Sequence, residues 1–163
     1  MGPVTKPIKH DRFLEEAIRV ARRSVLWDEG GPFGAVVVFD GKVVGRGQNR
    51  VTRKRDPTAH AEVVAIRNAC QKLNRYELRG AVLYSSCEPC PMCLAAAYWS
   101  RLDAIYFGAG RDEAAAAGFD DARLYAEVAK PIAKRTLPMT RLAVPDMLEP
   151  FEFWQAKSDR LDY

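Results

Sequence analysis

The sequence lacks the features that direct a chain into or across a membrane. No apolar run in its 163 residues approaches the roughly 18–20 residues of a transmembrane helix. The first segment, Met1 to Asp11, is polar and contains proline, and it has no apolar stretch of the kind found in secretory signals. We therefore expect a cytoplasmic protein with no membrane partner.

Internal repeats and a strong charge bias are also absent. Hydrophobic residues make up 48% and charged residues 28%, and no shift in composition marks a boundary, so we expect one domain over residues 1–163. The net charge of +4 is too small to indicate a nucleic-acid binder. The exception is a basic run that consists of Arg50, Arg53, Lys54 and Arg55. Two interpretations are open: a solvated loop, or a phosphate-contacting patch such as an RNA-editing enzyme needs.

Histidine and cysteine are scarce, but they are unevenly placed. The chain has two histidines, His10 and His60, and four cysteines, which are Cys70, Cys87, Cys90 and Cys93. The last three cysteines lie within seven residues, which is too close for a disulfide framework that ties distant segments together. In a cytoplasmic chain such crowding indicates a metal site or catalysis.

The hydrophobic pattern predicts alternating strands and helices. Apolar residues spaced three and four apart predict a first helix over 11–28, and Asp40-Gly41 between two apolar runs predicts a hairpin over 35–47. Further helices are expected over 58–73, 91–100, 114–117, 122–128 and the start of 151–163, with strands over 81–86, 103–109 and 139–144. This order predicts an α/β fold with three layers, α/β/α, around a mixed five-stranded sheet.

Two segments carry the candidate chemistry, Thr58–Glu62 and Cys87–Cys93, and each begins a predicted helix. Cys90 and Cys93 are three residues apart, so their side chains share one face of the first turn, where the helix dipole favours the metal-binding thiolate. Side chains in a first turn lean back over the open helix end. His60 and Glu62 can therefore both reach a metal that lies between two helix N-termini.

This ligand set predicts one catalytic zinc ion per chain. Three protein ligands, His60, Cys90 and Cys93, leave the fourth tetrahedral position open for water. Glu62 is not a ligand and is the candidate general acid and base. A structural zinc module would need a fourth protein ligand, and neither His10 nor Cys87 is a convincing one. Each residue alone also permits an ordinary role, such as a carboxylate at a helix start for Glu62.

His-Ala-Glu at 60–62, followed by Pro-Cys-Pro-Met-Cys at 89–93, resembles the signature of the cytidine-deaminase-like zinc deaminases. In that pattern the ligating cysteines follow Pro89, so Cys87 is excluded. The segments Gly30–Ala35, Asp56–Val63, Ser86–Cys93 and Gly118–Asp121, and the final tyrosine, resemble the bacterial guanine deaminases within this superfamily. The resemblance implies hydrolysis of guanine to xanthine and ammonia, with a small nucleobase rather than nucleic acid as the substrate.

The resemblance also implies a substrate pocket and a partner. It implies that Asn49 hydrogen-bonds the purine, that Phe33 and Trp99 pack on its ring, and that Asp121 and Tyr163 complete the pocket. A backbone N–H near Ala61 or Cys90 is a further candidate contact, which would polarise the ring. It implies a homodimer in which the C-terminal segments, about 145–163, are exchanged between subunits. The residue types alone also permit a turn amide, core packing and helix capping at these positions.

Other amine-bearing substrates remain open at this point. Guanosine, cytosine and aminotriazines are alternatives because the sequence does not reveal the pocket size. A tRNA adenosine deaminase would share the zinc signature and would use the basic run. Gly118-Phe119-Asp120-Asp121 and the terminal Tyr163 favour guanine over that alternative.

Overall fold

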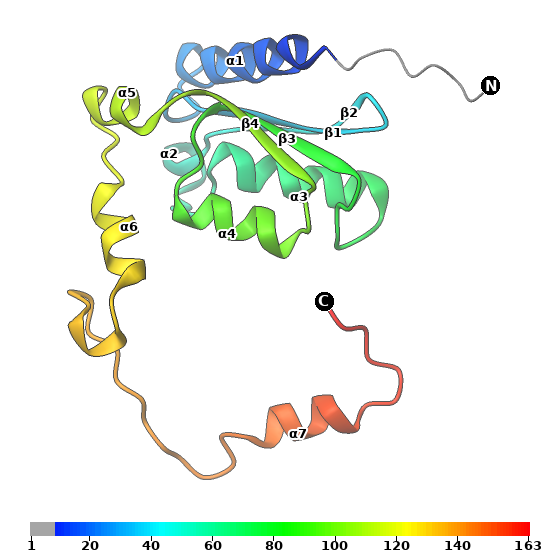
Figure 1. Cartoon of the computed structure of the whole chain (residues 1–163), viewed down its shortest axis with the longest axis vertical. Helices are drawn as coiled ribbons and strands as arrows, with labels where there is room; N and C mark the ends of the chain where they lie inside the picture. Colours follow the sequence, from blue (N-terminus) through cyan, green and yellow to red (C-terminus); the bar gives the residue numbers. More distant parts are fainter. Residues whose placement is uncertain (1–8) are drawn as a thin grey trace.

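A mixed four-stranded sheet forms the centre of the computed structural model, which describes residues 9–163 (Figure 1). The strands are β1 (Gly34–Phe39), β2 (Lys42–Gln48), β3 (Ala81–Cys87) and β4 (Ala104–Ala109), in the order β2-β1-β3-β4. β1 runs antiparallel to both β2 and β3, and β3 runs parallel to β4. The predicted hairpin is confirmed, and its Asp40-Gly41 turn has φ values of 48° and 69°, as a tight hairpin turn requires.

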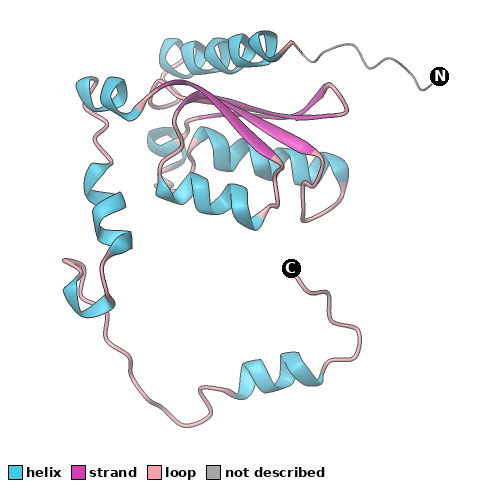
Figure 2. Cartoon of the chain, viewed as in Figure 1, coloured by secondary structure: helices cyan, strands magenta, loops and turns pink. Residues whose placement is uncertain are grey.

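Helices cover both faces of the sheet, which confirms the three predicted layers (Figures 1 and 2). α1 (His10–Leu26) lies on one face, and α3 (Ala61–Leu73) and α4 (Pro91–Trp99) lie on the other. Successive residues of β1 point to opposite faces. Val37 accordingly packs in the core on the α3 side, whereas Val36 packs with Phe13 of α1.

Two glycines of β2 let α3 lie unusually close to the sheet. A Cβ atom on Gly45 would be 2.2 Å from the carbonyl oxygen of Ala65, and one on Gly47 would be 2.0 Å from that of Ala61. Only glycine permits such an approach of backbone to backbone. The contact holds the first turn of α3 against β2 and so determines where the residues at that helix end lie.

The second helix begins later than the sequence pattern predicted. α3 begins at Ala61, with His60 as its N-cap, and a short helix α2 (Val51–Lys54) precedes it. The Asp56 side chain accepts hydrogen bonds from the backbone and hydroxyl of Thr58, at 2.8 and 2.7 Å. Asp56 therefore closes a turn of its own instead of capping the helix.

The predicted fifth strand is wrong. Residues 139–144 form neither helix nor strand and are exposed, so the sheet has four strands within the described residues 9–163. Prolines at 138 and 145 bracket the segment and limit its length, since proline has no backbone N–H to donate to a neighbouring strand. Its large apolar residues are Met139, Leu142 and Val144, whose spacing of three and then two is not the regular alternation of a strand facing a core.

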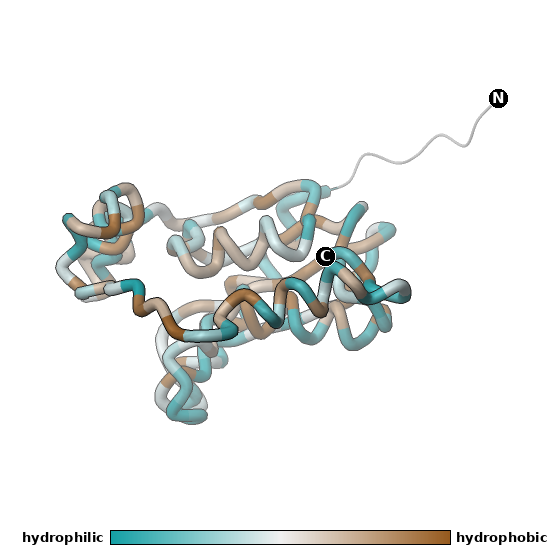
Figure 3. Tube along the Cα trace, turned by 90° about the horizontal axis from the view of Figure 1, so that it is seen from below, coloured by the Kyte–Doolittle hydropathy of each residue, from teal (hydrophilic) through white to brown (hydrophobic). Residues whose placement is uncertain are grey.

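The C-terminal part of the chain leaves the body of the molecule (Figure 1). α5 (Arg111–Ala116) and α6 (Ala122–Ala129) lead away from the sheet, followed by a 3₁₀ turn (Ile132–Lys134) and by α7 (Glu149–Ala156), which lies apart. Apolar positions recur along α7 (Figure 3), and Phe151 and Phe153 are 65% and 66% exposed. None of the helices within residues 9–163 has the length and apolar character needed to cross a lipid bilayer.

Candidate active site

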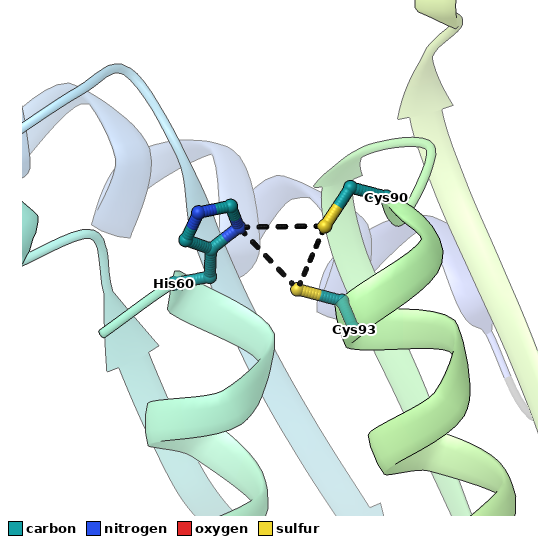
Figure 4. A group of neighbouring side chains, drawn as sticks. All are labelled: His60, Cys90 and Cys93. Atoms are coloured by element: carbon teal, nitrogen blue, oxygen red, sulfur yellow. Dashed lines mark hydrogen bonds between the residues drawn. The ribbon is translucent and has the colours of Figure 1, made fainter. Parts of the chain in front are cut away.

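Two helix N-termini face each other on the side of the sheet covered by α3 and α4, and they bring three predicted ligands together (Figure 4). His60 and Cys90 are the N-cap residues of α3 and α4, and both are extended, with φ and ψ of −67° and 152° and of −65° and 169°. Cys93 lies in the first turn of α4, where Pro91 occupies a position that needs no backbone donor. The two helix starts therefore present their ligands in the same way.

The spacing of the three ligand atoms fits a tetrahedral zinc ion. His60 Nδ1 lies 3.5 Å from Cys90 Sγ and 3.5 Å from Cys93 Sγ, and the two sulfurs are 3.6 Å apart. Zinc bond lengths of about 2.3 Å to sulfur and about 2.0 Å to nitrogen give a tetrahedron with a sulfur–sulfur edge of about 3.8 Å and sulfur–nitrogen edges of about 3.5 Å. The donor set could hold a metal ion of this kind, and it leaves one tetrahedral position free of protein.

The sulfur atoms are chemically distinct. The hydrogen bond from Cys93 and the neighbouring His60 lower the pKa of the Cys90 thiol to about 4, so this sulfur is a thiolate at neutral pH, the form that binds metal. Cys87 is different, because burial raises the pKa of its thiol and its Sγ points to the Gly110 carbonyl oxygen at 3.7 Å. Cys87 does not belong to the ligand triangle.

Glu62 lies beside the triangle and is 4% exposed. Ser85 Oγ donates to Glu62 Oε1 at 2.8 Å, and Cys93 Sγ lies 3.3 Å from Oε2. Burial raises the pKa of Glu62 above its ordinary value, whereas the hydrogen bond from Ser85 opposes that rise. A buried carboxyl group with a raised pKa, next to a metal site but outside its ligand set, is suited to accepting and returning a proton.

The triangle opens into a cavity of about 380 Å³. Four predicted site residues besides the two ligands His60 and Cys90 line this cavity: Phe33, Asn49, Glu62 and Asp121. The Asn49 Oδ1 atom accepts hydrogen bonds from the backbone of Gly31 and Val51, both at 3.2 Å. These two donors fix the orientation of the amide, so its N–H₂ group remains available to a ligand.

Three of the predicted substrate-binding residues do not line the cavity. Trp99 ends α4, is 67% exposed, and lies with its ring centroid 6.5 Å from that of Tyr163. Both rings therefore lie outside the pocket of their own chain. The side chain of Ala61 is buried in the core between α3 and the sheet, so this residue has only its backbone to offer at the helix start.

Sequence reasoning missed part of the pocket wall. Phe119 packs edge-to-face on Phe33, with ring centroids 4.9 Å apart, and its signal was present in the Gly118–Asp121 segment. Glu88 and Arg111 also line the cavity, with Arg111 Nε 3.3 Å from Glu88 Oε1. No local pattern marks Arg111, because its position depends on the pairing of β3 with β4.

The basic run lies next to the cavity. Val51 and Thr52 of α2 line it, whereas the charged side chains that follow are exposed. Arg50 is paired with Glu29, with Arg50 Nε 3.4 Å from the carboxylate. The solvated interpretation and the phosphate-contacting interpretation both remain compatible with this position.

A family model, sequence relatives and solved structures of zinc-binding deaminases all match this chain. Residues 7–109 match the family model described as the cytidine and deoxycytidylate deaminase zinc-binding region. The chain is 47% identical over 156 residues to guanine deaminase from Bacillus subtilis, covering 96% of this chain and all of that protein. The crystal structure of B. subtilis guanine deaminase superposes with a TM-score of 0.92 over 95% of this chain and 99% of that chain.

Two further relatives match less of the chain. The tRNA-specific adenosine deaminase of Agrobacterium fabrum is 46% identical over 97 residues, which cover 60% of this chain and 63% of that protein. A solved structure of guanine deaminase from Nitrosomonas europaea is 32% identical, with a TM-score of 0.66 over 72% of this chain and 68% of that chain.

The ligand set predicts which cysteine variants lose zinc. Cys90→Ala or Cys93→Ala should strip the zinc, because each removes one of three ligands, whereas Cys87→Ala should keep about one zinc per chain. Mass spectrometric metal analysis of the purified variants checks this. Loss of zinc from Cys87→Ala together with its retention in Cys93→Ala would contradict the ligand set.

Proposed function

This chain belongs to the cytidine and deoxycytidylate deaminase family of zinc-binding proteins, and we propose that it converts guanine to xanthine and ammonia, a step of purine metabolism. The substrate assignment rests on the length of chain over which this protein is similar to a guanine deaminase. The guanine deaminase of B. subtilis matches 96% of this chain, including the part beyond residue 109, whereas the A. fabrum tRNA deaminase matches 60%.

In this proposal His60, Cys90 and Cys93 hold one zinc ion per chain, and Glu62 moves the protons. When bound, zinc supplies a water molecule that is acidic enough to react near neutral pH. Glu62 Oε2 would take one proton from that water and give it to the ring nitrogen beside the amino-bearing carbon. It would then take the second proton from the hydroxyl newly attached to that carbon and give it to the amine, which leaves as ammonia while the carbonyl forms. Ser85 holds Oε1 throughout, so the second oxygen stays directed at the reacting atoms.

The pocket residues suit the edge and face of a purine. The free amide N–H₂ of Asn49 can donate to an acceptor on the base, and the Asp121 carboxylate can accept from a ring N–H. Phe33, supported by Phe119, offers an aromatic surface to the ring. The backbone N–H at Ala61, at the start of α3, is the proposed contact for polarising the ring.

We further propose that the protein is a homodimer in which segments 145–163 are exchanged. α7 has an exposed apolar face and packs extensively against no other described helix or strand of its own chain. Trp99 and Tyr163 lie together outside their own pocket, and Tyr76 Oη donates to the Asp162 carbonyl oxygen at 3.1 Å. Both aromatic residues would then reach a base only in the partner's pocket.

A cytoplasmic location is also part of the proposal. The four cysteines are free thiols, which suits a reducing compartment. Nucleic acid is not the proposed substrate. The basic run lies beside the cavity, and a tRNA substrate is therefore the alternative that the substrate test must include.

The substrate assignment predicts a rank order. Among guanine, guanosine, adenine, cytosine, an aminotriazine and a tRNA anticodon stem, guanine should have the highest kcat/KM. Ammonia release measures the small substrates, and inosine formation measures the tRNA. More efficient inosine formation in tRNA would contradict the proposal and would give the basic run a function.

The role of Glu62 predicts a loss of turnover without a loss of metal. Glu62→Gln keeps the shape of the side chain and an oxygen that can accept from Ser85, but it cannot move a proton, so guanine turnover should fall about a hundredfold or more. Zinc content and circular dichroism should match those of the wild type. The matched control is Glu15→Gln on the exposed side of α1. A Glu62→Gln enzyme that kept a tenth of the wild-type rate would refute the assignment.

Tail exchange predicts complementation between two defective chains. Deletion of residues 161–163 should leave the fold and zinc intact and lower guanine turnover about tenfold or more, because it removes a phenol and a carboxylate from the pocket. In a mixed dimer with Glu62→Gln, the truncated chain has an intact Glu62 and receives an intact tail. Equal co-expression should therefore restore about a quarter of the wild-type sites.

The mixed dimer is isolated by two different affinity tags, so its formation is measured separately from its activity. If isolated mixed dimers are no more active than their parents, exchange is wrong. A truncated enzyme with unimpaired turnover would remove Tyr163 from the site.

A further inference from the structure

One wall of the pocket is made by a segment that has almost no core of its own. Residues of α5, α6 and the loop between them line the cavity, namely Ala114, Gly118, Phe119, Asp120, Asp121 and Leu124. Neither helix contains a buried residue. The position of this wall relative to the metal centre must therefore depend on a small number of specific contacts.

Two contacts join this wall to the loop that carries Cys90, and a third holds the two wall residues together. The Tyr125 hydroxyl donates to the carbonyl oxygen of Pro89 at 2.7 Å. The guanidinium carbon of Arg111 lies 4.5 Å from the centre of the Tyr125 ring, and Arg111 Nε lies 3.3 Å from Glu88 Oε1. Within residues 9–163, the Tyr125 hydroxyl makes the only side-chain hydrogen bond from α6 to residues 9–109. We call Glu88, Arg111 and Tyr125 the wall cluster.

The wall cluster connects directly to Asp121. The backbone N–H of Tyr125 donates to the Asp121 carbonyl oxygen at 3.3 Å, so these two residues are one helical turn apart. At the other side of Tyr125, Pro89 is the neighbour of Cys90 in the sequence. A single side chain thus spans the distance between the ligand loop and the turn that presents the Asp121 carboxylate.

We propose that Tyr125 is a positioning residue that sets the distance of Asp121 and Phe119 from the metal centre, with Arg111 and Glu88 holding its ring. This inference rests on the proposed deaminase site but concerns only the substrate-binding wall. His60 and Glu62 lie at the start of α3, and within residues 9–163 no hydrogen bond or ion pair joins either of them to the wall cluster. A change at Tyr125 therefore weakens binding of the base and leaves proton transfer by Glu62 largely intact.

The test is Tyr125→Phe in the full-length zinc-loaded protein. This variant keeps the ring under Arg111 and removes only the hydrogen bond to Pro89. KM for guanine should rise about three- to tenfold, the effect of one lost hydrogen bond, while kcat stays within about twofold. Zinc content should not change. Tyr106→Phe is the matched control, because Tyr106 lies on β4 and does not line the cavity.

Arg111→Lys provides a second, independent variant. It keeps the positive charge near Glu88 but loses the planar group that stacks on Tyr125, and it should raise KM in the same direction. The double variant should raise KM by less than the product of the two single effects, because both act through one contact unit. Unchanged KM in Tyr125→Phe, or a fall in kcat that tracks lost zinc or lost folded protein, would overturn the proposal.

Hydrogen exchange supplies a readout that does not depend on the substrate. Backbone amides of residues 119–125 should exchange faster in Tyr125→Phe than in the wild type, and those of α3 should be unchanged. Equal exchange over 119–125 would overturn the positioning role even if KM changed. A wild-type enzyme with no activity on guanine would refute the proposed function, whereas faster exchange would still support the wall cluster.

Discussion

The whole site depends on two helix N-termini, those of α3 and α4, that lie next to each other on one face of the sheet. His60 and Cys90 must each end an extended segment at a helix start, and the two starts must approach to within the 3.5 Å that separates their ligand atoms. The glycines at 45 and 47 meet part of this requirement, since they let α3 lie directly on β2. Helix dipoles then favour thiolate at the metal, and the buried first turn of α3 keeps Glu62 beside it.

The sequence predicted those parts of the site that local pattern determines. The ligands follow from short motifs at helix starts, and the hairpin follows from Asp40-Gly41, because a tight turn restricts φ within a few residues. The sequence pattern failed in two places. The Asp56 side chain accepts from Thr58 in a local turn, and the second helix begins only at Ala61. Arg111 acquires its role only when β4 pairs with β3 and brings it to Glu88.

The expected fifth strand also shows that a local sequence pattern does not suffice to predict an element. Apolar residues at 139–144 read as a strand, but a strand also needs an edge that the chain can reach and donors along its length. Prolines on both sides limit the length of the segment. The chain leaves the sheet after α6, so the segment does not reach a sheet edge. Apolar residues in this region therefore remain exposed in a single chain, which is the physical reason to look for their cover in a second subunit.

The chain places its proposed chemistry before the end of β4 and one wall of its substrate pocket after it. The proposed zinc ligands and the proposed proton-transfer residue Glu62 all lie before Ala109, within the segment that matches the zinc-binding family region. The wall formed by α5 and α6 begins at Arg111 and includes Phe119 and Asp121, whereas Phe33 and Asn49 line the cavity from the first part of the chain. A sheet with two helix starts fixes the reactive atoms rigidly, whereas a wall with no buried core can change its residues without disturbing them. This separation explains physically how relatives that share the first part of the chain can act on substrates as different as a free base and a tRNA.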